Sequence, residues 1–251
     1  MFLRKDYMGN KIIIGNMKMY MNIRDIKDYL KKIENKIPNN VILCPTSIYI
    51  PYFLEKKYKI AIQNVCFQDN GAYTGEVSIE QVKNIGIDYI IIGHSERREY
   101  FHETDYDINK KVIKALSNDL KIIICIGETI FDKNNFNTNN ILREQLEISL
   151  NNVSSKYQDN IIIAYEPRWA IGSGMVPNNY EIFDTINYVK SFIKERYNMD
   201  IKVVYGGSIN DNNIDYLNKI ENVDGFMIGG ACTNPEKILK IISVINEYDN
   251  I

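Results

Sequence analysis

The sequence lacks the features that would place the protein in a membrane or hold it together by disulfides. No apolar run reaches the ~18–20 residues that a membrane-spanning helix requires, and the first residues, MFLRKDYMGNK, lack the apolar core of a signal peptide. The cysteines are widely scattered, form no CxxC pair and mostly lie inside or beside apolar runs: Cys44, Cys66, Cys125 and Cys232. We therefore expect reduced, packed thiols and no membrane partner.

An excess of charge of either sign is also missing. Lys and Arg number 30 against 32 Asp and Glu, which gives a net charge of −2. No basic excess indicates nucleic acid or an anionic membrane as a partner. An anionic small molecule would be held by local groups, such as helix N-termini and single lysines. We expect a cytoplasmic protein, or one of an organelle such as a plastid if a targeting segment upstream of Met1 has been removed.

The sequence has instead a series of short runs rich in Ile and Val. The runs are continuous and not alternating, so they indicate strands buried on both faces, which is typical of parallel sheet. Longer segments with helical spacing and charged faces lie between them. The predicted strands are 11–14, 41–43, 59–62, 89–92, 121–126, 161–165, 202–205 and 225–228, and the predicted helices include 25–36, 105–116, 141–153, 180–196 and 235–245.

About eight strand–helix units in 251 residues predict an α/β fold, a (β/α)8 barrel with a parallel eight-stranded barrel and outer helices. A doubly wound open sheet is the main rival, but no GxGxxG motif follows the first strand. No linker divides the chain, so we expect a single domain over residues 1–251, with residues 1–10 as an N-terminal extension. The asparagine-rich stretch 132–140 is most simply an exposed loop.

In such a barrel the chemistry lies at the carboxyl ends of the strands, and the unusual residues of this sequence follow the predicted strands. Asn16 and Lys18 follow the first strand and point to the same side if the strand geometry continues. The later strands are followed by Gly93, His94, Ser95 and Glu96, then Gly127 and Glu128, then Glu166, then Gly206, Gly207 and Ser208, and finally Gly229 and Gly230.

Glu166 ends the apolar run 161–165 and is followed by Pro167 and a loop of small residues that reaches Gly174. If that loop closes and removes water, the carboxylate becomes a stronger base, which suits proton abstraction. The alternative for the isolated stretch is a solvated surface glutamate. The proline and the following glycines favour a hinged lid, and therefore a catalytic base.

His94 and Lys18 each have an ordinary structural alternative. A lone histidine is more often a structural hydrogen-bonding group, but His94 precedes a helix expected to begin at Ser95, whose dipole disfavours the imidazolium and leaves a neutral donor. The other histidine, His102, is expected later in that helix without a catalytic role. Lys18 suits an anionic substrate or oxyanion, although a lysine leaving a strand for solvent is the commoner case.

The glycine pairs after the last two strands permit close backbone approach to a ligand. At the start of a helix they also present free N–H groups to an anion, and barrels often bind phosphate at this position. Tight turns use glycine as well, so either pair alone is a weak signal. Two such pairs in consecutive units favour a phosphate site.

Eight segments, taken in order along the chain, form a recognisable set. They are GNMKMY at 15–20, AIQN at 61–64, GAYTGEVS at 71–78, GHSERR at 93–98, CIGET at 125–129, AYEPRWAIGSG at 164–174, YGGS at 205–208 and DGFMIGGA at 224–231. In this combination the sequence resembles the triosephosphate isomerases over nearly its whole length. The resemblance implies a single-domain TIM barrel enzyme of glycolysis and gluconeogenesis that interconverts dihydroxyacetone phosphate and D-glyceraldehyde 3-phosphate, without metal or organic cofactor.

The resemblance also implies roles for the residues that match its motifs. Glu166 would move a proton between two carbons through an enediol(ate). His94 and Asn16 would polarise the carbonyl group. Lys18, with Glu96 as its partner, would stabilise the negative charge.

Further residues are implied to bind the phosphate and a second subunit. The backbone N–H groups of Gly172, Ser208, Gly229 and Gly230 would hold the phosphate, and residues 167–177 would form the closing lid. The long connection 63–78 would dock into a partner, so that Tyr73, Thr74 and Gly75 lie against the Asn16 and His94 region of that subunit. A homodimer follows by analogy.

The sequence departs from the family pattern at a few positions. Met17 stands where the family usually has Trp, Arg168 replaces an apolar residue in the first hinge of the lid, and Ser173 replaces Thr. Residues 175–177, Met-Val-Pro, form an unusual second hinge. We expect intact chemistry with altered lid movement.

Two alternatives remain at this stage. Another sugar-phosphate barrel enzyme would explain the glycine turns, but not His94 and Glu166 together with Asn16 and Lys18. A non-catalytic or impaired barrel protein is encouraged only by Met17 and Arg168.

Overall fold

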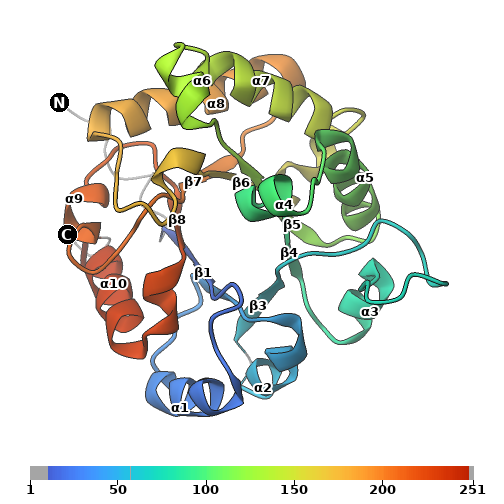
Figure 1. Cartoon of the computed structure of the whole chain (residues 1–251), viewed down its shortest axis with the longest axis vertical. Helices are drawn as coiled ribbons and strands as arrows, with labels where there is room; N and C mark the ends of the chain where they lie inside the picture. The colour runs from blue at the N-terminus through green and yellow to red at the C-terminus, as the bar shows by residue number, and fades with distance from the viewer. Residues whose placement is uncertain (1–10, 57, 249–251) are drawn as a thin grey trace.

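The fold is a closed barrel of eight parallel strands surrounded by helices (Figure 1). The computed structural model describes residues 11–56 and 58–248, and the expected extension over residues 1–10 lies outside them. The strands pair in chain order, and β1 pairs with β8 to close the ring. They are β1 (Ile12–Asn16), β2 (Val41–Cys44), β3 (Lys59–Ile62), β4 (Tyr89–Ile92), β5 (Lys121–Ile126), β6 (Ile161–Tyr165), β7 (Lys202–Tyr205) and β8 (Gly225–Ile228). The predicted (β/α)8 barrel is confirmed.

Strands β3 to β8 begin and end where the apolar runs predict, and the first two strands differ. β1 begins at Ile12 and continues to Asn16, and β2 continues to Cys44. Asn16 and Cys44 are paired in the ladder between these strands. Asn16, whose polar side chain lies at the mouth of the barrel, is therefore the last residue of β1. An apolar pattern alone does not predict this.

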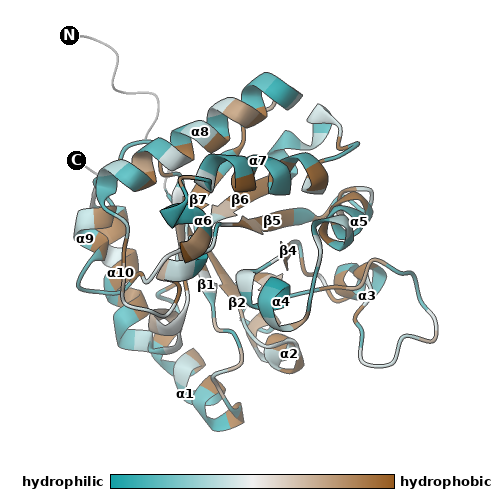
Figure 2. Ribbon diagram, turned by 45° about the horizontal axis from the view of Figure 1, so that its top comes forward, coloured by the Kyte–Doolittle hydropathy of each residue, from teal (hydrophilic) through white to brown (hydrophobic). Residues whose placement is uncertain are grey.

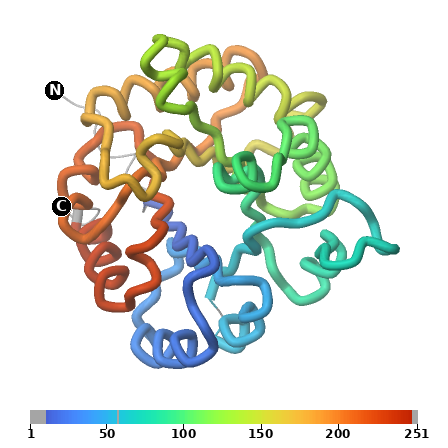
Figure 3. Tube along the Cα trace, viewed as in Figure 1, coloured from blue at the N-terminus to red at the C-terminus, as the bar shows by residue number. Residues whose placement is uncertain are grey.

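The helices form a ring outside the strands, and the chain runs once around the barrel from blue to red (Figure 3). The long helices expected from periodicity are all present, whereas α2, α3, α6 and α9 contain too few turns to show it. The helices are α1 (Ile23–Ile33), α2 (Ile50–Leu54), α3 (Ile79–Asn84), α4 (Ser95–Tyr100), α5 (Asp105–Leu116), α6 (Ile130–Asn134), α7 (Thr138–Ser149), α8 (Asn179–Tyr197), α9 (Ile214–Leu217) and α10 (Pro235–Tyr248). In the described part of the chain, no helix has the length and apolar character to cross a membrane.

The expected loop over residues 132–140 is wrong, because this stretch contains the end of α6 and the start of α7. Thr129 caps α6: its hydroxyl accepts the Asp132 N–H at 3.2 Å, and the Asp132 carboxylate accepts the Thr129 N–H at 3.0 Å. Such a cap stabilises a helix start by about 1 kcal/mol relative to alanine. The asparagines therefore occupy helix ends and a short turn.

Helix α4 is shorter than the sequence suggests. It ends at Tyr100, and His102 has a φ of 54°, in the left-handed region. The Glu103 N–H donates to the Arg97 carbonyl oxygen at 3.1 Å, which turns the chain toward α5. The expectation that His102 lies within this helix is wrong, and its side chain is exposed.

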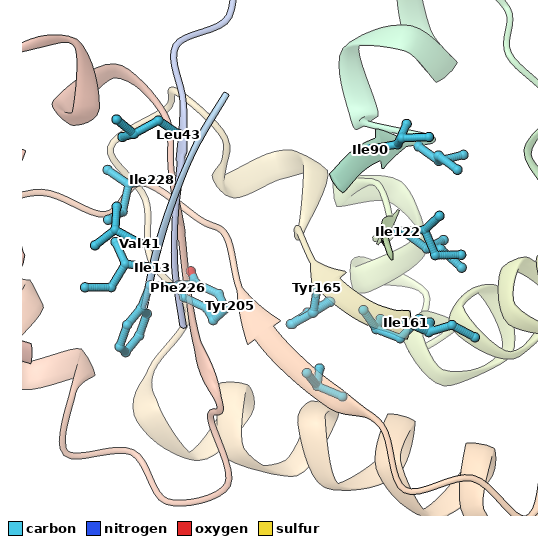
Figure 4. Packing of buried hydrophobic residues seen from close by; sticks show 14 of the residues in the cluster. Ile13, Val41, Leu43, Ile90, Ile122, Ile161, Tyr165, Tyr205, Phe226 and Ile228 are labelled. Carbon is cyan, nitrogen blue, oxygen red and sulfur yellow. The ribbon is translucent and has the colours of Figure 1, made fainter. Parts of the chain in front are cut away.

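Apolar side chains cover both faces of the strands. One set faces the barrel interior and consists of Ile14, Ile42, Cys44, Ala61, Tyr89, Ile91, Ile123, Cys125, Ile162, Ala164, Val204 and Met227. The alternate set, which includes Ile13, Val41 and Phe226, packs outward against the helices (Figure 4). Figure 2 shows the strands as mainly hydrophobic ribbons inside helices of mixed character. This two-sided burial is the reason for the continuous apolar runs in the sequence.

The long connection 63–78 projects away from the barrel between β3 and α3 (Figures 1 and 2). A bridge between Cys66 and Ser78 closes its base, and Ser78 caps α3. Residues 71–76 are exposed, including the Tyr73 ring. The barrel itself does not bury the tip of this segment.

Candidate active site

A cavity of about 520 Å³ lies at the carboxyl ends of the strands. Its walls come from the loops after β1, β4, β6, β7 and β8. The predicted residues that line it are Asn16, Lys18, His94, Glu166, Gly172, Ser208, Gly229 and Gly230. Glu96 joins this group through Lys18, whose Nζ lies 2.6 Å from Glu96 Oε1. The barrel therefore brings the residues expected for catalysis and phosphate binding to one place.

Glu166 follows β6 directly and only 3% of it is exposed. Its backbone N–H donates to the Ile126 carbonyl oxygen at 2.8 Å, which continues the pairing of β5 with β6. The carboxylate Oε1 lies 3.4 Å from His94 Nε2, and Oε2 has no hydrogen-bond partner within the described residues. Glu166 is thus not a solvated surface residue, and one of its oxygens is free to accept a proton.

Two glycines make room for Glu166. A Cβ on Gly127 would lie 1.8 Å from the Glu166 carbonyl oxygen, and a Cβ on Gly206 would lie 3.0 Å from its Cγ. Gln145 fixes Gly127 from the other side, since its Oε1 accepts the Gly127 N–H at 2.9 Å and its Nε2 donates to the Gly127 carbonyl at 3.1 Å. The backbone that carries the carboxylate is therefore held closely in place.

His94 occupies the N-cap position of α4, and its Nδ1 accepts the Glu96 N–H at 3.3 Å. A ring nitrogen that accepts a hydrogen bond carries no proton, so the neutral ring has its proton on Nε2. Nε2 is the atom that faces Glu166. The start of this helix thus directs Nε2, the donor nitrogen of a neutral ring, toward Glu166.

Lys18 reaches the cavity through a turn and not through a continued strand. Its φ is 50°, in the left-handed region, and its N–H donates to Asn16 Oδ1 at 3.0 Å. Its carbonyl accepts hydrogen bonds from Thr46 Oγ1 and Gln63 Nε2, both at 2.9 Å. Asn16 and Lys18 do share the cavity wall, but the strand geometry expected to place them there ends at Asn16.

The lid is folded onto the loop that follows β7. The Ser208 hydroxyl donates to the Ala170 carbonyl and accepts the Gly174 N–H at 3.3 Å. Gly172, between these contacts, has a φ of 66°, which favours glycine. Gly230, which also lines the cavity, begins a 3₁₀ turn, Gly230–Thr233. Backbone N–H groups from the lid and from the loop after β8 can therefore approach one anion.

Burial changes the acidity of two groups near the base of the lid. It raises the pKa of the Glu128 carboxyl, against the opposing effect of hydrogen bonds from Trp169 Nε1 at 2.7 Å and Tyr165 OH at 3.3 Å. Burial, and then the nearby Glu166 carboxylate, raises the pKa of the Cys125 thiol well above its usual range. The sulfur beside Glu166 therefore remains protonated.

Two of the departures from the family pattern, Met17 and Arg168, have different surroundings. Met17 is buried in the outer core, and its N–H donates to the Cys44 carbonyl oxygen at 3.1 Å. Arg168 begins a 3₁₀ turn, and its guanidinium Nη2 lies 3.8 Å from Glu99 Oε2 on α4. The first hinge of the lid therefore carries an ion pair.

Several cavity residues are missed by sequence reasoning, among them Tyr20, Asn210, Asn234 and Lys237. Asn210 follows the predicted phosphate loop and is accessible to the same argument. Lys237 lies in the first turn of α10, where a lysine normally faces solvent, so no local signal identifies it.

The residues expected to contact a second subunit are separate from the cavity. They are Tyr73, Thr74 and Gly75, and they do not line the cavity of their own chain. Over residues 11–56 and 58–248, no group of three or more His, Cys, Asp or Glu side chains is arranged to hold a metal ion.

Comparison with known proteins gives one consistent family. The model of the triosephosphate isomerase family matches residues 11–245. The triosephosphate isomerase of Alkaliphilus oremlandii is 36% identical over 247 residues, which cover 94% of this chain and 100% of that protein. That of Clostridium botulinum strain Loch Maree is 35% identical with the same coverage, and that of Mycoplasma capricolum is 39% identical over 235 residues, or 89% of this chain and 94% of that protein. The chain belongs to the triosephosphate isomerase family.

Proposed function

We propose that Glu166 is the base with which this chain carries out the reaction of its family. The chain is an isomerase that interconverts dihydroxyacetone phosphate and D-glyceraldehyde 3-phosphate. A proton next to a carbonyl group is weakly acidic, so a base and an oxyanion stabiliser are both required. The observation that carries the proposal is the 3.4 Å separation of Glu166 Oε1 and His94 Nε2 in the cavity wall.

Each group has a separate task in the proposed mechanism. Glu166 takes a proton from one substrate carbon and returns it to the neighbouring carbon, while His94 Nε2–H donates to the carbonyl oxygen. Because Asn16 Oδ1 is occupied by the Lys18 N–H, the Asn16 amide NH₂ is left to donate to the substrate. The Lys18 ammonium, oriented by Glu96, stabilises the enediolate charge.

The substrate phosphate is proposed to lie between the lid and the last two loops. The N–H groups of Gly172, Ser208, Gly229 and Gly230 are the donors in this proposal. A Cβ on Gly230 would meet nothing within 4 Å, so its backbone borders open space in which an anion can approach. Lys237, on the same cavity wall, adds a positive charge.

A coupled isomerase assay with both triose phosphates tests the proposal on the wild type and on Glu166→Gln. The variant should lose about 10³-fold or more in kcat and retain inhibition by inorganic phosphate. Glu34→Gln, at an exposed glutamate paired with Lys56, is the control and should retain full activity. Wild-type turnover of a larger sugar phosphate alone would favour another barrel enzyme, and turnover of no sugar phosphate would favour a non-catalytic protein.

We also propose that two copies of the chain form a homodimer through the connection 63–78. Residues 71–76 are exposed, and so are two large apolar side chains at or beside the motifs of the predicted site: Met19 in GNMKMY at 88% and Phe101, three residues after GHSERR, at 65%. A second subunit would remove these groups from water. Tyr73, Thr74 and Gly75 would then contact the Asn16 and His94 region of the partner.

Light scattering over a dilution series tests the dimer. Thr74→Arg should dissociate at a higher protein concentration than the wild type and lose specific activity as it dissociates. Asn139→Arg, on the exposed surface of α7, should do neither. A wild type that is monomeric and fully active at every concentration would contradict the proposal.

We propose the cytoplasm as the compartment. The four cysteines lie in the described part of the chain as free thiols, a state that a reducing compartment maintains. Imaging of a fluorescent fusion of the complete gene product tests this, and a signal confined to an organelle would contradict it.

A further inference from the structure

The single tryptophan of the chain, Trp169, lies in the 3₁₀ turn Arg168–Ala170 at the start of the lid. Its indole Nε1–H donates to Glu128 Oε1 at 2.7 Å. Glu128 is 1% exposed and lies two residues after the end of β5, outside the lid 167–177. One edge of the indole is therefore fixed to the barrel.

The face of the same indole is covered by Lys133 of α6. Lys133 Nζ lies 3.8 Å from the centroid of the Trp169 ring, a short cation–π distance. The same Nζ lies 3.0 Å from Glu181 Oε1. Glu181 cannot rotate freely, because its Oε2 accepts the Asn178 N–H at 2.9 Å in the cap of α8.

These contacts connect the two ends of the lid. Trp169 stands at the first hinge, and the capping residue Asn178 follows the last residue of the second hinge, Pro177. Lys133 belongs to neither, yet it touches the first hinge through the indole and the start of α8 through Glu181. A single position of the Lys133 ammonium group therefore makes both the contact with the Trp169 ring and the ion pair with Glu181.

We propose that Lys133 is a positioning residue that sets the closed position of the lid by holding Trp169 and Glu181 together. The proposal rests on the proposed role of the lid in the isomerase reaction. Lys133 does not line the cavity and does not touch the substrate site. It acts through Trp169, which is separated from Glu166 by Pro167 and Arg168 only.

Fluorescence of the single tryptophan, titrated with inorganic phosphate, tests the proposal together with steady-state kinetics. Lys133→Met retains most of the side-chain volume but removes the charge. We expect its phosphate dissociation constant to rise about 3- to 10-fold, the effect of losing one cation–π and one ion-pair contact in the closed state. Its unliganded emission spectrum should differ from that of the wild type, and kcat should fall with KM raised.

Two variants make the test specific. Lys133→Arg retains a cation over the ring and should restore phosphate affinity to within about twofold. Lys194→Met removes an exposed lysine that pairs with Asp200 at the far end of α8, and should leave every value unchanged. If Lys133→Met fails to fold, Glu181→Gln preserves the helix cap, removes the carboxylate charge and should show a smaller shift in the same direction.

The outcomes separate this proposal from the proposed function. A folded Lys133→Met whose spectrum, phosphate affinity, kcat and KM equal those of the wild type overturns the role of Lys133. Absence of isomerase turnover in the wild type would overturn the proposed mechanism instead, while the fluorescence titration would still report how Lys133 affects the lid.

Discussion

The Arg168 guanidinium and the Glu99 carboxylate lie 3.8 Å apart, which links the first hinge of the lid to α4, the helix that begins after His94. Arg168 Nε is buried and has no hydrogen-bond partner within the described residues. The pair is partly exposed, and an ion pair of this kind contributes about 1 kcal/mol. Such an energy is nevertheless sufficient to change the ratio of open to closed lids about fivefold.

Replacing Arg168 by valine should therefore change lid movement while leaving the chemical groups intact. We expect Arg168→Val to change kcat, or the affinity for a phosphate analogue, by about twofold to fivefold. Assays at low and high salt should show the wild type converging on the variant, because salt screens an exposed pair.

Glu99→Gln is the matched variant for this prediction, since it removes the same ion pair from the other side. It should reproduce the direction of the Arg168→Val effect. Unchanged turnover and unchanged phosphate-analogue affinity in Arg168→Val would show that the charge in the hinge has no role.

Loss of the Lys18 charge should affect the transition state more than folding. Lys18→Met should lower kcat/KM about 10²- to 10³-fold, as is typical for removal of one oxyanion-stabilising group. Urea unfolding should show a much smaller change. Lys83→Met, at an exposed lysine on α3, is the control, and an equal effect of the two substitutions on kcat/KM would refute the assignment of Lys18.

Gly127→Ala should be one of the most damaging small substitutions in the chain. The added Cβ would meet the Glu166 carbonyl oxygen at 1.8 Å, so either the β5 end or Glu166 must move. We expect the free energy of unfolding to fall by roughly 1–3 kcal/mol, the usual cost of overpacking a core. Activity should be lost as well. In urea unfolding, Gly230→Ala should stay within about 0.5 kcal/mol of the wild type because its Cβ meets open space.

Ionisation of Glu128 should make stability depend on pH in the acid range. Burial raises the pKa of Glu128 above its ordinary value of 4.5, so the folded chain holds this proton more tightly than the unfolded chain. The contribution of Glu128 to stability is therefore largest below pH 4.5 and falls as the pH rises through the raised pKa. The amide in Glu128→Gln does not titrate. The unfolding free energy of the wild type minus that of this variant should therefore be largest below pH 4.5 and fall as the pH rises.

A second readout for the same carboxyl is the fluorescence of Trp169. Protonation of Glu128 removes the charge that accepts the indole N–H, so the emission of the wild type should change over the same pH interval. A flat emission in the wild type and a pH-independent stability difference would together contradict the raised pKa.

Much of the barrel is predictable from the sequence because strands buried on two faces produce uninterrupted Ile and Val runs. Such runs locate β5 and β6 to the residue. The end of β1 is not predictable in this way, since Asn16 is a strand residue with a polar side chain. Short helices such as α6 depend on caps, and the Thr129–Asp132 pair is the only local signal that the asparagine-rich stretch is helical.

The candidate site is predictable as a set of residues but not as a geometry. Strand ends identify His94 and Glu166, because parallel strands bring their carboxyl ends together. No sequence pattern shows that Lys18 has a left-handed backbone, or that Lys133 covers the ring of Trp169. These contacts depend on side chains from separate units of the barrel, whose distances are set only when all units pack.

The closure of the ring by pairing of β1 with β8 has a consequence for refolding. Asn16 and Lys18 follow the first strand, whereas Gly229 and Gly230 follow the last, and a Cβ on Gly229 would lie 3.4 Å from Lys18 Cε. The parts of the cavity proposed to stabilise the charge and to bind the phosphate therefore become neighbours only after the two ends of the chain have met. Recovery of enzymatic activity after denaturation should mark the completion of the barrel and should follow the recovery of helical circular dichroism.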